Sequence, residues 1–244
     1  QIVGQEESLP ILRLYGWQPL CLSLGYGQRL SDADQERIQS QGWGIVRRPT
    51  GGKAILHGRE LTYSVTLSRD HEFAQGDVVE SYRRISEALI AALKILGLSP
   101  QSEPQAKGNK GLGPVCFEVP SHYEITVGGK KLIGSAQVRR REGILQHGSL
   151  PLYGDISQIC DALHYETEVE REEAKHQVRA RATTLEAVLG RRITWNEAAD
   201  ALTQGFQHAF DLAFLPEPMT AAEFAAAEEI MQETYANPDW LHKR

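Results

Sequence analysis

The stretch that decides the fold is residues 44–67, which read GIVRRPTGGKAILHGRELTYSVTL. Gly44 to Arg47 and Leu61 to Leu67 are short apolar segments with glycine or polar boundaries, and they predict two β-strands. Between them, Gly51 and Gly52 allow the backbone to approach a ligand closely, with N–H groups that can face an anion or a carbonyl oxygen. The neighbouring arginines suit a carboxylate or a phosphate. The same pattern also occurs in ordinary hairpins, so both interpretations stand at this point.

Similar segments continue the predicted sheet on both sides of this stretch. The further strands expected are Ile11 to Tyr15, Leu20 to Tyr26, His122 to Val127, Lys131 to Val138 and Ile144 to Leu152, with a turn at Gly128–Gly129. Helices are expected over Asp32 to Ser40 with Ser31 as cap, over Asp77 to Leu96 with Asp77 and Glu80 as a capping pair, and over Asp155 to Tyr165. Two amphipathic helices are expected after the capping boxes Thr194–Glu197 and Thr220–Glu223. A mixed sheet flanked by helices belongs to class α+β.

The composition excludes several classes of protein. With 244 residues, 41% of them hydrophobic, the chain has enough apolar material to fold without disulfides or a metal. Its three cysteines form no CxxC motif and its histidines show no ligand spacing, so we predict no metal site and a reducing, cytoplasmic compartment. A net charge of −6 offers no uniformly basic surface for nucleic acid. The apolar runs all fall short of the roughly 20 residues of a membrane helix.

Residues 99–114 are rich in glycine, proline and polar residues, with almost no apolar side chains. We expect a mobile loop rather than a domain linker, because strand-like sequence resumes directly after it. Residues 1–244 are therefore expected to form a single domain. The chain starts without Met and with neither a signal nor a transit peptide, which suggests that it begins inside a longer gene product.

Three further residues can carry chemistry, and each has a structural alternative. Cys116 enters a strand at the edge of the loop, where a substrate can reach its thiol, but most free cysteines are small buried hydrophobes. We assign Cys21 and Cys160 to that buried class. Lys131 lies beside small residues that leave room for a ligand near its ammonium, although most lysines are solvated. His147 can orient a partner or transfer a proton, but a lone histidine is more often structural.

Five motifs in one order give the chain a resemblance to a known family. They are RRPTGGKAILH at 47–57, LTYSV at 61–65, CFEVPS at 116–121, KLIGSAQ at 131–137 and LQHGSL at 145–150. Together they resemble the lipoate-protein ligase/octanoyltransferase family, closely over residues 11–152 and more loosely beyond. The resemblance implies a biotin/lipoate-ligase-like α+β fold and the transfer of a C8 acyl chain to a lysine of a lipoyl domain. The family normally opens with a strand and a helix before the LRLYGW stretch at 12–17, but this sequence begins about ten residues before that stretch, so we expect that segment either to be missing here or to be built otherwise.

The resemblance also implies the residues of the site. Cys116 fits the catalytic cysteine of the cysteine-dependent octanoyltransferases, and Lys131 matches the family's invariant ligand-binding lysine. The substrate-binding residues implied are Arg48, Thr50, Gly51, Gly52, His57, Gly134, Ser135, Ala136, His147 and Gly148. Which of Ile55, Leu132 and Ile133 faces the acyl slot is left open.

Two chemistries compete within this family. ATP-dependent ligases carry a third glycine in the glycine turn and usually an accessory C-terminal domain, whereas this chain has Lys53 at that position and little sequence to spare after Leu152. We therefore predict an octanoyltransferase without a cofactor. Its donor is octanoyl-acyl carrier protein, and its acceptor is a lipoyl domain or H protein. An ATP-dependent lipoate ligase and a non-catalytic acyl-binding module are the alternatives.

The expected mechanism is a covalent relay. The thiolate of Cys116 attacks the thioester carbonyl and forms an acyl-enzyme. Lys131 lowers the pKa of that thiol and, once it has lost its own proton, acts as a base toward the acceptor amine. Backbone N–H groups near Gly51–Gly52 or Gly134–Ser135 stabilise the oxyanion. The run Arg139–Arg141 is either a docking surface for acidic partner domains or a solvated run of charges.

Overall fold

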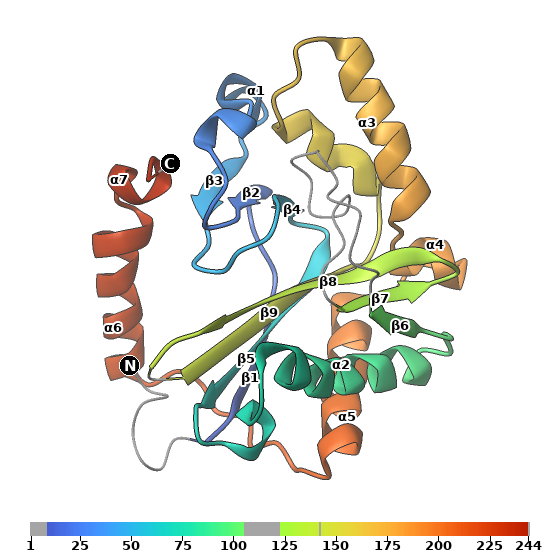
Figure 1. The fold of residues 1–244 in the computed structure, drawn as a ribbon, viewed down its shortest axis with the longest axis vertical. Coiled ribbons are helices and arrows are strands. Elements are labelled where there is room, and N and C mark those ends of the chain that lie inside the picture. The colour runs from blue at the N-terminus through green and yellow to red at the C-terminus, as the bar shows by residue number, and fades with distance from the viewer. Residues whose placement is uncertain (1–8, 105–122, 142, 244) are drawn as a thin grey trace.

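The computed structural model describes residues 9–104, 123–141 and 143–243, and within them the chain forms two sheets (Figure 1). The larger sheet has the strand order β1 (Ile11–Tyr15), β5 (Glu60–Ser68), β9 (Gly143–Pro151), β8 (Lys130–Arg139), β7 (Tyr123–Val127) and β6 (Gln101–Pro104), with each neighbouring pair antiparallel. The smaller sheet has the order β3 (Gly44–Arg47), β2 (Cys21–Leu24) and β4 (Ile55–His57). Strand β2 is parallel to β3 and antiparallel to β4, so the expected mixed α+β architecture is confirmed.

Helices α2 (Val78–Ile95) and α5 (Trp195–Phe210) pack together against one face of the larger sheet (Figure 1). The expected capping box of Asp77 and Glu80 opens α2, and the buried Ile85, Leu89 and Leu93 face the core. The two helices approach so closely that a Cβ atom at Gly205 would lie 2.6 Å from the carbonyl oxygen of Ala88. This pair of helices makes the first of two hydrophobic cores.

The second core lies beside the smaller sheet. Helix α1 (Gln35–Ser40), the 3₁₀ helix η4 (Ile156–Ala162) and helix α3 (Glu168–Arg181) surround it. Its buried residues include Leu22, Leu24, Ile38, Leu163 and Val178. The side chain of Arg171 enters this core and donates hydrogen bonds to the carbonyl oxygens of Cys160 and Leu163. The glycine turn between β3 and β4 is therefore held by a packed support.

The chain ends in helices that follow both cores. The short elements η2 (Leu30–Asp32), η3 (Glu72–Ala74) and α4 (Leu185–Leu189) connect the larger ones. After α5 come α6 (Ala221–Ile230), a π-helical turn η5 (Met231–Tyr235) and α7 (Pro238–Leu241), which run along one side of the molecule and reach the smaller sheet (Figure 1). Among the described helices, none combines the length and the apolar character that a membrane crossing needs.

Several predicted elements are wrong in detail, for local reasons. The first helix begins at Gln35 because Asp34, not Ser31, accepts the hydrogen bond of the first turn. The segment after Asp155 is a 3₁₀ helix rather than an α-helix. The expected loop over residues 99–114 contains strand β6. The sequence of β6 has too few apolar residues to predict a strand, and the strand forms because it pairs with β7. The remainder of that predicted loop, residues 105–114, lies outside the described residues.

The C-terminal helices also differ from expectation. Thr194 caps α5, but the carboxylate of Glu197 binds Arg191 instead of completing the capping box. Thr220 and Glu223 do form a complete box, yet the helix that they open, α6, contains no buried residue and is not an amphipathic core helix. Helix α3 was not anticipated, because its sequence is dominated by charge and only Arg171, Ala174 and Val178 are buried.

Candidate active site

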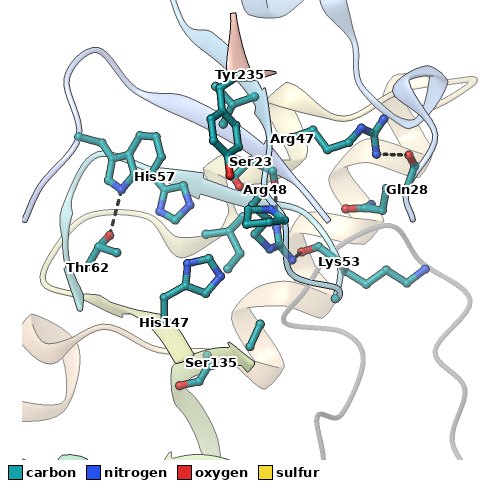
Figure 2. Close-up of a pocket in the computed structure, with 18 of the residues that line it drawn as sticks. Ser23, Gln28, Arg47, Arg48, Lys53, His57, Thr62, Ser135, His147 and Tyr235 are labelled. Atoms are coloured by element: carbon teal, nitrogen blue, oxygen red, sulfur yellow. Dashed lines mark hydrogen bonds between the residues drawn. The ribbon is translucent and has the colours of Figure 1, made fainter. Parts of the chain in front are cut away.

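A cavity of about 930 Å³ lies between the smaller sheet and strands β5, β8 and β9. Figure 2 shows His57, from β4, and His147, from β9, pointing into it from the two sheets, with Arg48 between them in the view. The predicted site residues on its wall are Arg48, Gly52, His57, Gly134, Ser135, Ala136, His147 and Gly148. Ile55 also lines the cavity, whereas Leu132 and Ile133 belong to the first hydrophobic core. Thr50 and Gly51 do not line the cavity; Thr50 is buried and Gly51 is exposed.

The glycine turn is held in shape by Arg48. The buried guanidinium of this residue donates hydrogen bonds to the carbonyl oxygens of Ser23, Gly51 and Lys53, at 2.8, 2.9 and 2.7 Å. Gly52 has φ +94°, and a Cβ atom on the facing Gly25 would lie 1.9 Å from the Gly52 carbonyl oxygen. The two backbones therefore touch, and Arg48 shapes the turn as well as lining the cavity.

A buried carboxylate orients His57. The side chain of Glu60, which is 6% exposed, accepts hydrogen bonds from His57 Nδ1, from the Ser149 hydroxyl and, at 2.6 Å, from Thr62 Oγ1. Burial raises the pKa of this carboxyl, but the charge and hydrogen bond of His57, with the hydroxyls of Ser149 and Thr62, hold it below its usual value. Because a carboxylate only accepts, Nδ1 of His57 carries the proton and Nε2 is the acceptor when the ring is neutral.

Trp17 completes this part of the wall. Its indole ring stacks on the His57 ring at 4.4 Å between centroids, and its Nε1 donates a hydrogen bond of 3.0 Å to Thr62 Oγ1. Neither Trp17 nor Glu60 was predicted as a site residue. For Glu60 the signal was its separation of three residues from His57 across the β4–β5 turn. Nothing in the sequence around Trp17 indicated that its ring stacks on His57.

His147 is the second imidazole of the cavity. Its Nε2 shares a hydrogen bond of 2.6 Å with the hydroxyl of the buried Thr50. Burial, with the positive charges of Arg48 and His57 nearby, lowers the pKa of His147 to about 4. The ring is therefore neutral near pH 7, and Thr50 fixes its orientation from behind the wall.

Strands β8 and β9 form a tightly packed part of the cavity wall. A Cβ atom at Gly148 would lie 2.5 Å from the Gly134 carbonyl oxygen and 2.6 Å from the Tyr63 ring. The Tyr63 hydroxyl is 2.7 Å from Ser135 Oγ, which fixes that side chain beside the cavity. Small residues are required at these positions because the two strands and the Tyr63 ring already fill the space.

Lys131 lies directly behind this wall. It is 2% exposed, and its Nζ forms an ion pair of 2.7 Å with Glu124. A Cβ atom at Gly134 would lie 3.4 Å from Lys131 Cε, so the absence of a side chain at Gly134 makes room for the lysine. Cys116 lies outside the described residues, and its predicted pairing with Lys131 stays a prediction.

The predicted arginine run divides into two parts. Arg139 donates hydrogen bonds to the carbonyl oxygens of Ala74, Gly76 and Asp77, so it holds the turn before α2 rather than a partner domain. Arg140 and Arg141 are exposed, and their docking role stays a prediction.

Sequence comparisons agree on one family. Residues 1–207 match the family model of the lipoyl protein ligase A/B catalytic domain. Octanoyltransferase LipM of Brevibacillus brevis is 38% identical over 251 residues, covering 100% of this chain and 91% of that protein. Octanoyltransferase LipM of Bacillus subtilis is 36% identical, covering 99% and 89%.

The solved structures that resemble this chain support the fold. A bi-partite lipoate protein ligase of Thermoplasma acidophilum matches with a TM-score of 0.79 and 24% identity, covering 96% of this chain and 84% of that one. Lipoate-protein ligase A bound with ATP matches with a TM-score of 0.78 and 24% identity, covering 96% and 85%. Identities this low show the shared fold, and confirm the architecture expected from the motifs.

Proposed function

This chain belongs to the lipoyl protein ligase A/B catalytic domain family and is an octanoyltransferase, and we propose how its reaction proceeds. An octanoyl chain moves from octanoyl-acyl carrier protein to Cys116, and then to a lysine of a lipoyl domain or H protein, in lipoate biosynthesis. Similarity to octanoyltransferases over the whole chain carries this proposal. We further propose that residues 1–244 form one catalytic domain and that the enzyme is cytoplasmic.

The cavity suits a medium-length acyl chain. Tyr15, Trp17, Val46 and Ile55 supply apolar wall, and the cavity of about 930 Å³ exceeds what eight carbons require, which leaves space for the donor arm or the acceptor lysine. Each methylene that leaves water contributes about 0.8 kcal/mol, so an octanoyl chain gains several kcal/mol from this wall.

The first step is attack of the Cys116 thiolate on the thioester carbonyl of the donor. A carbon–sulfur bond to Cys116 forms, the bond to the carrier breaks, and the carrier thiolate takes up a proton. The ammonium of Lys131 favours the thiolate form of the cysteine, and Glu124 forms an ion pair with that ammonium. Backbone N–H groups beside Gly51–Gly52 or Gly134–Ser135 stabilise the oxyanion.

In the second step, the amine of the acceptor lysine attacks the acyl-enzyme. An amide bond forms, Cys116 leaves as the thiolate, and the nitrogen releases one proton to a base. Lys131 in its neutral form is the base implied by the family resemblance. Neutral His147 and the Nε2 atom of His57 offer two further acceptors among the residues that line the cavity.

Transfer to a purified lipoyl domain, followed by mass spectrometry, tests this function. With octanoyl-acyl carrier protein and no ATP, the acceptor is expected to gain one octanoyl group. Cys116→Ser should abolish this gain, whereas Cys160→Ser, at a buried cysteine of the second core, should retain it.

A parallel reaction with free octanoate and ATP separates the alternatives. Modification only in that reaction would identify an ATP-dependent ligase and overturn the proposal. No modification in either reaction, together with retained acyl binding, would indicate a binding module. Lys53, which lines the cavity where ligases of this family carry a third glycine, favours the thioester donor.

A further inference from the structure

The C-terminal arm, residues 220–243, contributes to the cavity although it lies beyond the residues that match the family model. The arm consists of α6, the π-helical turn and α7, and none of its described residues is buried. It runs beside the two sheets rather than within either core (Figure 1). A segment held so loosely needs a specific anchor to stay at the cavity.

Arg47 supplies that anchor. Its guanidinium is 1% exposed and donates hydrogen bonds to the carbonyl oxygens of Trp240, at 3.2 Å, and Leu241, at 2.8 Å. In return, Trp240 Nε1 donates a hydrogen bond of 2.8 Å to the Arg47 carbonyl oxygen. Trp240 also contacts the rings of Tyr26 and Tyr235. Arg47 immediately precedes Arg48, so two neighbouring residues hold the arm and the glycine turn, which both line the cavity.

The π-helical turn directs two side chains of the arm at the cavity. Met231 and Tyr235, its first and last residues, line the cavity, and Figure 2 shows Tyr235 above Arg48 and Ser23. Both are still partly open to solvent, at 49% and 38% exposure. Ile230 is similarly exposed, at 41%, but does not line the cavity. π-Helical turns occur frequently at functional sites because they redirect side chains within a helix.

We infer that the C-terminal arm forms the outer wall of the acyl cavity, and that Met231 and Tyr235 contact the acyl chain and set its preferred length. This inference rests on the proposed function of the cavity. Two half-exposed apolar side chains beside an apolar cavity gain burial when a chain fills the space between them and the sheets. An octanoyl chain covers the side chains of Met231 and Tyr235, whereas a longer acyl chain must displace the arm.

Competition between donors of two chain lengths tests the inference. Wild type, Met231→Ala, Tyr235→Ala and the double variant would each receive an equal mixture of octanoyl and dodecanoyl carrier protein, with the acylated acceptor measured by mass spectrometry. We expect the octanoyl-to-dodecanoyl product ratio to fall about tenfold in the double variant. The octanoyl chain then loses burial against both side chains, and burial equal to two methylenes corresponds to roughly that factor. Ile230→Ala is the matched control, and its ratio should equal that of wild type.

The possible outcomes separate the inference from the proposed function. If wild type transfers octanoate and the double variant keeps the wild-type ratio, the inference is overturned and the proposed function stands. If wild type transfers neither chain, the proposed function fails. In that case, calorimetric titration of each protein with free octanoate and with free dodecanoate tests the outer wall alone. If the ratio of the two affinities is equal in wild type and the double variant, the inference is overturned.

Discussion

The two walls of the cavity are built in opposite ways. The inner wall, from the glycine turn and strands β5, β8 and β9, rests on buried, hydrogen-bonded side chains, with Glu60 accepting three hydrogen bonds and Arg48 donating three. The outer wall, from the C-terminal arm, has no buried residue among those described and depends on the contact between Arg47 and Trp240. Chemistry requires fixed groups, and entry of a long substrate requires a wall that can yield. We therefore expect changes in the inner wall to affect the whole fold, and changes in the outer wall to affect selectivity.

The largest effect is expected at Glu60. Glu60→Ala leaves His57 and the hydroxyls of Thr62 and Ser149 without their shared acceptor, so we expect a loss of about 3–5 kcal/mol in the free energy of unfolding. Chemical denaturation measures this change. Glu87→Ala, on the exposed face of α2, is the control and should stay within about 0.5 kcal/mol of wild type. Equal stability of the two variants would remove the distinction between the walls.

The next effect is a pH dependence that comes from His147. Its pKa is about 4 in the folded chain and 6.5 as the ordinary value, so the unfolded chain binds more protons between these values. The stabilising contribution of the neutral ring is complete above pH 6.5 and is lost as the pH falls toward 4, by about 3 kcal/mol in total. The free energy of unfolding, measured between pH 7 and 4, should fall less steeply with decreasing pH for His147→Gln than for wild type. Parallel curves for the two proteins would show that His147 is not held neutral.

A smaller loss is expected from Gly148→Ala. The added Cβ would lie 2.5 Å from the Gly134 carbonyl oxygen, so β8 and β9 must separate, at a cost of about 1–3 kcal/mol, and octanoyl transfer should fall as well. Gly27→Ala is a matched change on the same cavity, where an added Cβ has no atom within 4 Å. The free energy of unfolding of Gly27→Ala should lie within about 1 kcal/mol of the wild-type value. Thermal melts of the two variants that coincide would contradict the close packing of this wall.

The smallest global effect is expected from Trp240→Ala in the arm. The free energy of unfolding of the whole chain should change by no more than about 1 kcal/mol, because the arm adds no buried residue to either core and only Leu241 packs against the second one. Hydrogen exchange should nevertheless accelerate across residues 221–243, since local opening of the arm no longer breaks its anchor. A cooperative loss of stability in the whole chain would show that the arm belongs to the rigid part of the fold.

The sequence predicted the inner wall better than the outer one. Strand periodicity and the glycine turn located β3, β5, β8 and β9 within a few residues, because each local pattern matches the tertiary packing. Eight of the ten residues that the motifs predict to bind substrate line the cavity, and Thr50 hydrogen-bonds to His147 from behind it. Glu60 was missed although its three-residue separation from His57 was a signal, whereas Trp17 was missed because its stacking on His57 is a tertiary contact that a linear pattern does not encode.

The arm was missed for a different reason. Its capping box correctly predicted the start of α6, but capping describes only a helix terminus and carries no information on what the helix covers. The anchor joins Arg47 to Trp240, residues separated by 193 positions, and the cavity contact depends on a π-helical turn without a sequence signal. The sequence predicted that the arginines at 47–48 suit a carboxylate or phosphate ligand, which stays a prediction. In the structure, Arg47 bonds to carbonyl oxygens of the arm and Arg48 to carbonyl oxygens around the glycine turn.

Intact-protein mass spectrometry of the enzyme with octanoyl-acyl carrier protein, in the absence of any acceptor, tests the covalent relay most directly. The account predicts that wild type and Cys21→Ser each gain one octanoyl group, which a subsequent addition of lipoyl domain removes. Cys116→Ser should gain none. Transfer to the acceptor by a Cys116→Ser enzyme that never carries the chain would contradict the relay, and would require direct attack of the acceptor lysine on the donor thioester.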